Sequence, residues 1–165
     1  MCGPASAPAQ KPLPKAQADA VAAIKKLGGL VHLSTKSDEV ISVMLYRPKI
    51  PDAGLEHLKE LTSLTHLSLG GPQVTDAGLE HLKGMTGLKQ LSLYDTKITD
   101  AGLVHLKGLT SLTNLNLRDT QITDTGLAHL KGLTSLRGLS LFGTQITDAG
   151  LAELKAALPR CRVRN

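Results

Sequence analysis

Residues 88–111 read LKQLSLYDTKITDAGLVHLKGLTS, and residues 112–135 read LTNLNLRDTQITDTGLAHLKGLTS. The two blocks align without a gap, and so do the flanking blocks 64–87 and 136–159, although the last one diverges near its end. A looser copy over 40–63 (VISVMLYRPKIPDAGLEHLKELTS) comes before them. A fixed period of 24 residues indicates a stacked solenoid, because one unit of that length cannot bury its own apolar face.

Each repeat contains a strand pattern followed by a helix pattern. L-x-x-L-x-L predicts a short strand whose leucines point into a core while alternate side chains point outward. Thr99-Asp100 predicts a helix start, since threonine can cap free N–H groups and aspartate suits the positive end of a helix. Lys107-Gly108 predicts its end, with the glycine in the left-handed conformation, and Gly102 marks a close approach to a neighbouring backbone. The expected fold is therefore α/β, with a concave parallel sheet and a convex helical back.

Four segments are expected along the chain. They are a disordered Pro/Ala-rich tail (1–14), an N-terminal cap of a helix plus a strand (15–39), five repeats (40–159) and a C-terminal capping strand (160–165). Within the cap, a helix is predicted over 15–27, where Gly28-Gly29 ends the apolar periodicity. Short strands are predicted over 30–33 and 40–45.

The outward strand positions form columns along the concave face. Equivalent residues of neighbouring strands stand about 4.8 Å apart. One column holds all three aromatic residues of the chain, in the order Tyr46, Gly70, Tyr94, Arg118 and Phe142. Successive rings are two repeats apart, which is about 10 Å.

Aromatic and arginine side chains are the usual anchors of binding surfaces, because they bury a large area at a small entropic cost. The predicted partner-binding residues on the concave face are Tyr46, Tyr94, Arg118, Phe142, His66, Asp95, Asp119 and Asn116. The two aspartates beside Arg118 favour a partner with some positive charge. The alternative is that this strand position simply tolerates large side chains.

Other site chemistries find little support in the sequence. His57, His81, His105 and His129 recur once per repeat, but neighbouring helices pack about 8–10 Å apart, too far for one ion with bonds of about 2.0–2.1 Å. No metal site, cofactor or catalytic residue is predicted, since no nucleophile–base pair or phosphate-binding glycine loop is present. A net charge of +5 with scattered basic residues does not predict nucleic-acid binding.

The repeats resemble the leucine-rich repeat family. The residues that carry the match are L-x-x-L-x-L-x-x-[NCT]-x-[IL] and the I-T-D-A-G-L segment that follows. The nearest types are the ribonuclease-inhibitor-like and cysteine-containing ones, in particular bacterial proteins with T-D-A-G-L-x-H-L repeats. The chain departs from them where the family has asparagine or cysteine, with Thr96, Thr120 and Thr144 in three copies and Pro48 and Pro72 in the first two. Threonine can still bond the loop backbone, whereas the prolines imply a looser turn.

The resemblance implies a non-catalytic interaction module that binds a protein or peptide on its concave face. Two alternatives stay open: stacking of an envelope polysaccharide on the aromatic column, and a structural adaptor or spacer. Met-Cys-Gly-Pro at the start is compatible with a lipoprotein whose Cys2 carries the lipid, which would place the protein at the cell envelope, outside the cytoplasm. An ordinary tail and a cytoplasmic protein are the alternative.

Overall fold

A computed structural model of the chain describes residues 12–35, 37, 39–46 and 51–165. The predictions for Cys2, Pro48 and most of the tail therefore lie outside the described residues. None of the helices within these ranges is long and apolar enough to cross a membrane.

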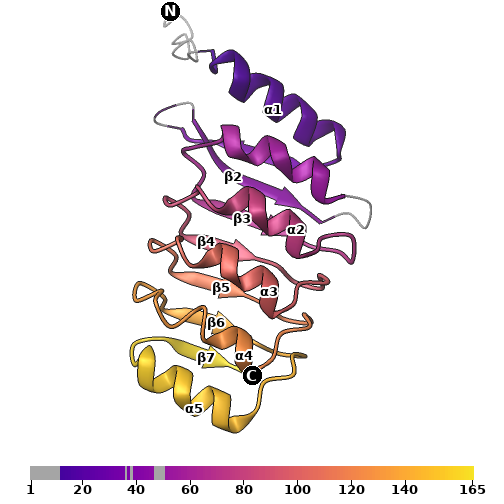
Figure 1. The fold of residues 1–165 in the computed structure, drawn as a ribbon. Coiled ribbons are helices and arrows are strands. Elements are labelled where there is room, and N and C mark those ends of the chain that lie inside the picture. The colour runs from indigo at the N-terminus through magenta and orange to yellow at the C-terminus, as the bar shows by residue number, and fades with distance from the viewer. Residues whose placement is uncertain (1–11, 36, 38, 47–50) are drawn as a thin grey trace, which may run out of the picture.

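The described residues form one sheet of seven strands, which lie in the order of the sequence. Figure 1 shows the strands stacked one after another, with the helices along one side. The strands are β1 (Leu30–Leu33), β2 (Val40–Leu45), β3 (His66–Leu69), β4 (Gln90–Ser92), β5 (Asn114–Asn116), β6 (Gly138–Ser140) and β7 (Arg162–Arg164). β1 and β2 are antiparallel and every later pair is parallel, so the repeats build the predicted parallel sheet.

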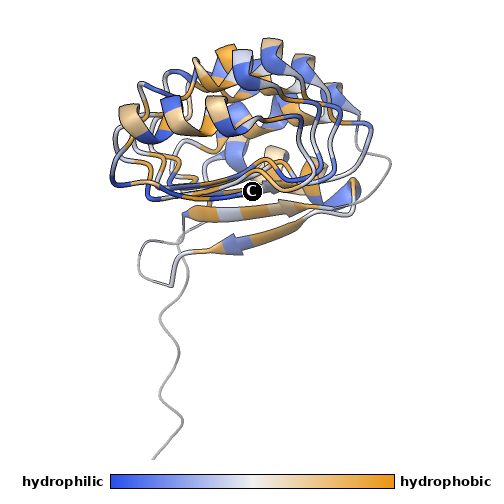
Figure 2. Ribbon diagram, turned by 90° about the horizontal axis from the view of Figure 1, so that it is seen from below, coloured by the Kyte–Doolittle hydropathy of each residue, from blue (hydrophilic) through white to orange (hydrophobic). Residues whose placement is uncertain are grey.

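The helices form the second layer, on the opposite side from the open sheet face (Figure 2). The α-helices are α1 (Lys15–Lys26), α2 (Asp76–Leu79), α3 (Asp100–Leu103), α4 (Asp124–Leu127) and α5 (Asp148–Ala157). The described residues also form the 3₁₀ helices η1 (Asp52–Glu60), η2 (Glu80–Leu82) and η3 (Val104–Leu106). In α2–η2 and α3–η3 the single predicted helix is thus one α turn that continues as 3₁₀.

Leucine spacing accounts for this tight winding. Leu103, Leu106 and Leu109 are three residues apart and fully buried. Residues three apart lie on one face of a 3₁₀ helix, so the tight turn aims the first two side chains into the core. On the strand side Leu91 and Leu93 are buried as predicted.

The glycines after the helical lysines do not adopt the predicted conformation. Gly28 ends α1 at a φ of 82°, but Gly84, Gly108 and Gly132 are not among the glycines with positive φ. The 3₁₀ turns end without a left-handed residue, because the next leucine donates its N–H to a carbonyl three residues back, as Leu109 does to Leu106 O at 2.9 Å.

The Thr-Asp pair joins neighbouring repeats as well as starting a helix. Asp76 Oδ1 accepts a hydrogen bond from the main-chain N–H of Thr99 at 2.8 Å, and Asp76 Oδ2 accepts one from the Thr99 hydroxyl at 2.6 Å. The same pair of bonds joins Asp52 to Thr75, Asp100 to Thr123 and Asp124 to Thr147. We call these four connections the Asp–Thr staples. They hold each repeat in a fixed position on the one before it.

The early-helix glycine makes room for the staple. A Cβ atom on Gly126 would collide with Asp100 Oδ1, and Gly78, Gly102 and Gly150 stand in the same relation to the preceding aspartate. A close approach was predicted at these glycines, but its partner is mainly a carboxylate of the preceding repeat and not a neighbouring backbone.

The turns after β4, β5 and β6 are closed by the threonine that replaces the family's asparagine or cysteine. The Thr96 hydroxyl donates to Leu93 O at 2.7 Å, and Thr120 and Thr144 make the same bond to Leu117 and Leu141. Asp95 and Asp119 hold left-handed φ values of 55° and 56° in this turn. The turn fixes the direction in which the residues before it project.

Candidate functional site: the concave face of the sheet

An open groove of about 1030 Å³ runs along the sheet face away from the helices. Two rows of side chains form its floor, one per alternate strand position. The first row is Ser42, His66, Gln90, Asn114, Gly138 and Arg162. The second row is Met44, Ser68, Ser92, Asn116, Ser140 and Arg164. Both rows consist of outward strand positions that the repeat alignment brings into register, and each ends in one arginine of β7.

The three aromatic rings follow the strands, at the point where these pass into the turns. Tyr46 and Arg118 of this column line the groove, and Tyr94 and Phe142 lie on either side of Arg118. Tyr46, Tyr94 and Phe142 are 56%, 41% and 47% exposed, so all three rings are open to solvent. Main-chain hydrogen bonds continue past the strands here, from Asp95 N to Arg118 O at 3.0 Å and from Asp119 N to Phe142 O at 2.7 Å. The backbone therefore holds the aromatic column in register beyond the strands.

Arg118 fills the space between two of these rings. Its guanidinium carbon lies 5.9 Å from the centre of the Tyr94 ring and 5.7 Å from that of the Phe142 ring, within the range of cation–π attraction. Arg118 Nε also donates to Asp119 Oδ2 at 3.2 Å. At Gly70, a Cβ atom would stand 3.3 Å from Tyr46 Cδ1. Tyr94, Arg118 and Phe142 thus form one continuous surface, and the Tyr46 ring lies beside Gly70.

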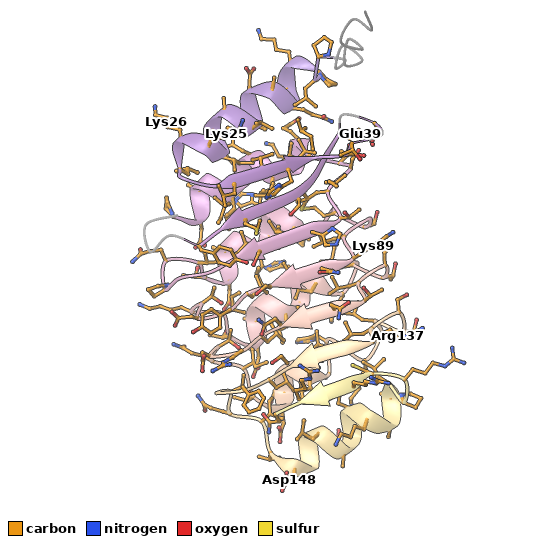
Figure 3. All side chains as sticks on the ribbon, turned by 180° about the vertical axis from the view of Figure 1, so that it is seen from behind. Lys25, Lys26, Glu39, Lys89, Arg137 and Asp148 are labelled. Atoms are coloured by element: carbon orange, nitrogen blue, oxygen red, sulfur yellow. The ribbon has the colours of Figure 1, made fainter. Side chains whose placement is uncertain are left out.

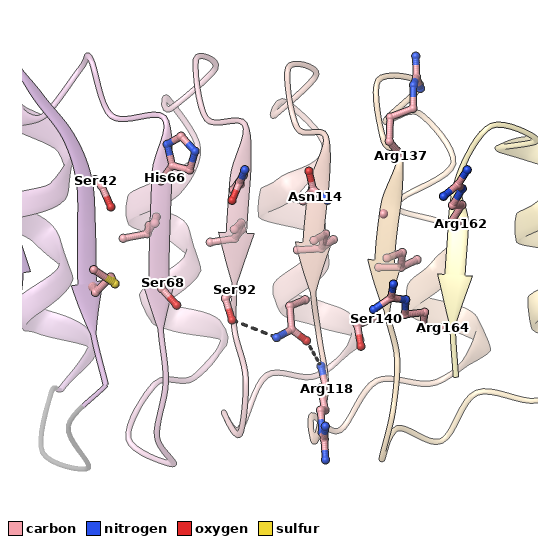
Figure 4. A pocket seen from close by; sticks show the side chains of 18 of the residues that line it. Ser42, His66, Ser68, Ser92, Asn114, Arg118, Arg137, Ser140, Arg162 and Arg164 are labelled. Carbon is pink, nitrogen blue, oxygen red and sulfur yellow. Dashed lines mark hydrogen bonds between the residues drawn. The ribbon is translucent and has the colours of Figure 1, made fainter. Parts of the chain in front are cut away.

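Asn116 connects this column to the floor of the groove. Its Nδ2 donates to Ser92 Oγ at 3.2 Å, and its Oδ1 accepts the Arg118 main-chain N–H at 3.1 Å, as the dashed lines in Figure 4 show. Both the nitrogen and the oxygen of the Asn116 amide are hydrogen-bonded, so Asn116 orients the Ser92 hydroxyl and the main chain of Arg118.

His66 makes a local bond instead of activating a serine. Its Nδ1 lies 2.8 Å from Thr65 Oγ1, whose proton points to Ile41 O at 3.1 Å. Ser68 Oγ, in the next row, is buried and has no hydrogen-bond partner among the described residues. The groove floor therefore offers polar contacts but no hydrogen-bonded nucleophile–base pair within the described residues.

Four arginines that the sequence analysis did not include also line the groove: Arg137, Arg160, Arg162 and Arg164. Figure 4 shows Arg162 and Arg164 projecting from β7, and Figure 3 shows Arg137 at the loop edge of the sheet. Arg162 and Arg164 could have been found by continuing the two rows one period past Gly138 and Ser140. The expectation of a positively charged partner rested on two aspartates, which these guanidinium groups outnumber.

The convex side carries the recurring histidines. His57, His81, His105 and His129 are half-buried, and in the part of the chain that the structure describes no group of three or more His, Cys, Asp or Glu side chains could hold a metal ion. Cys161 is buried at the C-terminal end, and this burial raises the pKa of its thiol, against a smaller opposite effect of the Arg137 charge.

Sequence profiles described as leucine rich repeat match residues 62–122 and 132–155, together about half of the chain. The chain belongs to the leucine-rich repeat family. Leucine-rich repeat proteins are generally protein-interaction modules, and they are typically non-enzymatic. The comparison does not distinguish the subtype. A search of curated protein sequences finds no match.

Solved leucine-rich repeat structures agree with this fold. The chain is similar to an internalin (InlF) from Listeria monocytogenes, with 30% identity and a TM-score of 0.65, over 76% of this chain and 34% of that one. It is also similar to internalin C2 of the same species, at 24% identity and a TM-score of 0.60, over 91% and 73% of the two chains. A tropomodulin C-terminal domain from Caenorhabditis elegans matches at 14% identity and a TM-score of 0.57, over 86% and 92%. The chain spans about a third of the length of the internalin InlF structure.

Proposed function

We propose that this leucine-rich repeat protein binds a protein or peptide segment on the concave face of its sheet. The observation that carries the proposal is the exposed column of Tyr46, Tyr94, Arg118 and Phe142 along a groove of about 1030 Å³. Exposed apolar surface of this kind is rare on a soluble domain unless it is used. Tyr94, Arg118 and Phe142 are expected to carry much of the binding energy, with Tyr46, His66, Asn116, Asp95 and Asp119 around them.

A peptide suits this surface better than a polysaccharide does. Sugar rings need free aromatic faces to stack on, and the guanidinium of Arg118 lies between the rings of Tyr94 and Phe142. The groove floor instead presents hydroxyl and amide groups, such as those of Ser92 and Asn114, that can bond a peptide backbone.

The proposal is tested by selecting binders from a displayed library of random dodecapeptides, with the whole chain immobilised. Selected peptides are then measured by fluorescence polarisation against Tyr94→Ala and Phe142→Ala. Removing one central anchor is expected to weaken binding at least tenfold, the size typical of a binding hot spot.

Val104→Ala is the matched control, because Val104 is also an exposed apolar residue, at 42%, but lies on the convex η3. It should leave the affinity within twofold. Peptides that bind Tyr94→Ala and Phe142→Ala as well as they bind the unmodified protein would remove the aromatic column from the site. A library that yields no binders would count against peptide recognition itself.

A further inference from the structure

The groove changes in chemistry from one end of the stack to the other. At its N-terminal end Leu30 of β1 pairs with Met44 of β2, and paired residues project to the same face of a sheet. Leu30 is 60% exposed, and the exposed Tyr46 ring follows β2 directly. The second row is therefore apolar at this end, whereas the first row holds Ser42 with the exposed His32 beside it.

The C-terminal end is basic. Arg162 and Arg164 occupy alternate positions of β7, so both project from the concave face. Within the described part of the chain, the side chains of Arg160, Arg162 and Arg164 make no ion pair or hydrogen bond. Arg137 Nη1 donates to Thr134 O at 3.0 Å and Leu136 O at 3.1 Å, which holds that guanidinium at the groove edge.

The neighbouring polar groups also present donors at this end. The single proton of the Thr113 hydroxyl is shared between Lys89 O at 2.9 Å and Asn114 Oδ1 at 3.0 Å, and Asn114 Nδ2 has no hydrogen-bond acceptor among the described residues. The next position in the row is Gly138, and the Asn114 amide leans over it, since a Cβ atom there would stand 2.8 Å from Asn114 Nδ2. Among the described residues that line the groove, none is an aspartate or glutamate.

We propose that the groove binds an extended acidic peptide, with aspartate or glutamate carboxylates at Arg162 and Arg164 and an apolar side chain at Leu30, Met44 and Tyr46. This inference rests on the proposed function and names the chemistry of its ligand. Arginine pairs with carboxylates through two parallel hydrogen bonds, which gives direction as well as attraction.

Discrete carboxylates fit this surface better than a nucleic acid does. The exposed carboxylates of Asp95 and Asp119 stand in the turns beside the aromatic column, and they would repel a continuous phosphate backbone along the groove. A peptide can place its acidic residues at one end only.

The geometry also sets the spacing between the two ends of the ligand. Met44 on β2 and Arg164 on β7 are five strand steps apart, about 24 Å at about 4.8 Å per step. An extended chain covers about 3.3 Å per residue. The acidic and apolar residues of the peptide should therefore be about seven positions apart.

The test uses the random dodecapeptide selection on the full chain, followed by sequencing. Binders are expected to contain clustered Asp or Glu about seven positions from a large apolar residue. Replacing their acidic residues by Gln or Asn should weaken binding at least tenfold. With the double variant Arg162→Ala/Arg164→Ala, the acidic peptides should bind less than twofold more tightly than their Gln or Asn counterparts. Arg162→Lys/Arg164→Lys should retain part of this preference for acidic peptides.

Lys107→Ala/Lys155→Ala is the matched control, because it removes the same net charge from exposed convex residues. If this control lost the preference for acidic peptides to the same extent, the attraction would be nonspecific and the inference would be overturned. Neutral binders that still depend on Tyr94 would overturn it while leaving the proposed function standing. Single-stranded RNA is the competitor that tests for a polyanion. The inference would be overturned if this RNA bound the unmodified protein more tightly than the peptides do, and displaced them from it but not from Arg162→Ala/Arg164→Ala.

Discussion

Asp100 and Thr123 lie 23 residues apart in the chain and are joined by two hydrogen bonds, at 2.8 Å to the threonine N–H and at 2.6 Å to its hydroxyl. The bond donors start the next helix, so each Asp–Thr staple sets the position of the following repeat. Because the groove is built from side chains of successive repeats, the staples on the back also set the spacing of the concave rows.

Removing a central staple should destabilise the protein. Asp100→Ala deletes two hydrogen bonds to a charged acceptor, each worth about 1.5–3 kcal/mol, in addition to about 0.3–1 kcal/mol for a charge at a helix start. Asp148→Ala is the matched control: it removes the same helix-start charge, but no staple to Asp148 is present in the described residues. Urea denaturation should show a loss at least about 1 kcal/mol larger for Asp100→Ala. Equal losses would mean that the staple contributes nothing beyond the helix dipole.

Gly126→Ala should be destabilising even though alanine favours helices, because the added Cβ collides with Asp100 Oδ1. Overpacking of this kind typically costs about 1–3 kcal/mol. At Gly132 no atom lies within 4 Å of an added Cβ, so Gly132→Ala should be neutral or stabilising by about 0.4–1 kcal/mol.

The double variant Asp100→Ala/Gly126→Ala should lose less than the sum of the single variants, because the colliding carboxylate is gone. Strict additivity in thermal or urea unfolding would contradict the proposed collision.

Thr147 lowers the pKa of Asp124, first through its hydroxyl and then through its main-chain N–H. A carboxyl whose folded pKa is depressed adds stability above its unfolded pKa, and that stability is lost as the pH falls through the folded value. Thr147→Val should therefore move the Asp124 pKa back toward its ordinary value, as followed by carboxyl ¹³C NMR. Thr144→Val serves as control, since the Thr144 hydroxyl bonds Leu141 O instead, and it should leave the Asp124 titration unchanged.

The Cys161 thiol should react slowly in the folded protein. Burial raises its pKa, and only the thiolate attacks disulfide reagents. In a Cys2→Ser background, the rate with Ellman's reagent should be at least tenfold lower than in urea, and its pH midpoint should lie higher. Arg137→Ala should shift that midpoint higher still, because the Arg137 charge partly offsets the effect of burial. Coincident midpoints in the folded and unfolded protein would contradict a buried thiol.

The repeat alignment was enough to predict the sheet in detail. Strands at Leu30–Leu33 and Val40–Leu45 have the predicted bounds. For Val40–Leu45, the period fixed the register and the apolar alternation fixed the buried face. Tyr46, Tyr94 and Phe142 share one exposed edge for the same reason.

The bonds between repeats were harder to predict. A single repeat shows Asp100 as a helix-start residue, whereas its partner Thr123 is found only when two repeats are stacked. The left-handed glycine was predicted from the behaviour of α-helices, and the 3₁₀ turns at Gly84 and Gly108 do not need it. The basic end of the groove was missed because the columns were followed only through the fifth repeat.

The uniform staples give this scaffold an adjustable length. Since every interior junction uses the same Asp, Thr and Gly, inserting a copy of 112–135 would join both neighbours with the contacts they already make. Such an insertion would move the arginines of β7 away from Leu30 and Tyr46 by one strand, about 4.8 Å. Duplication of a repeat would therefore lengthen the groove to fit a longer ligand, while the residues at both ends of the groove stay the same.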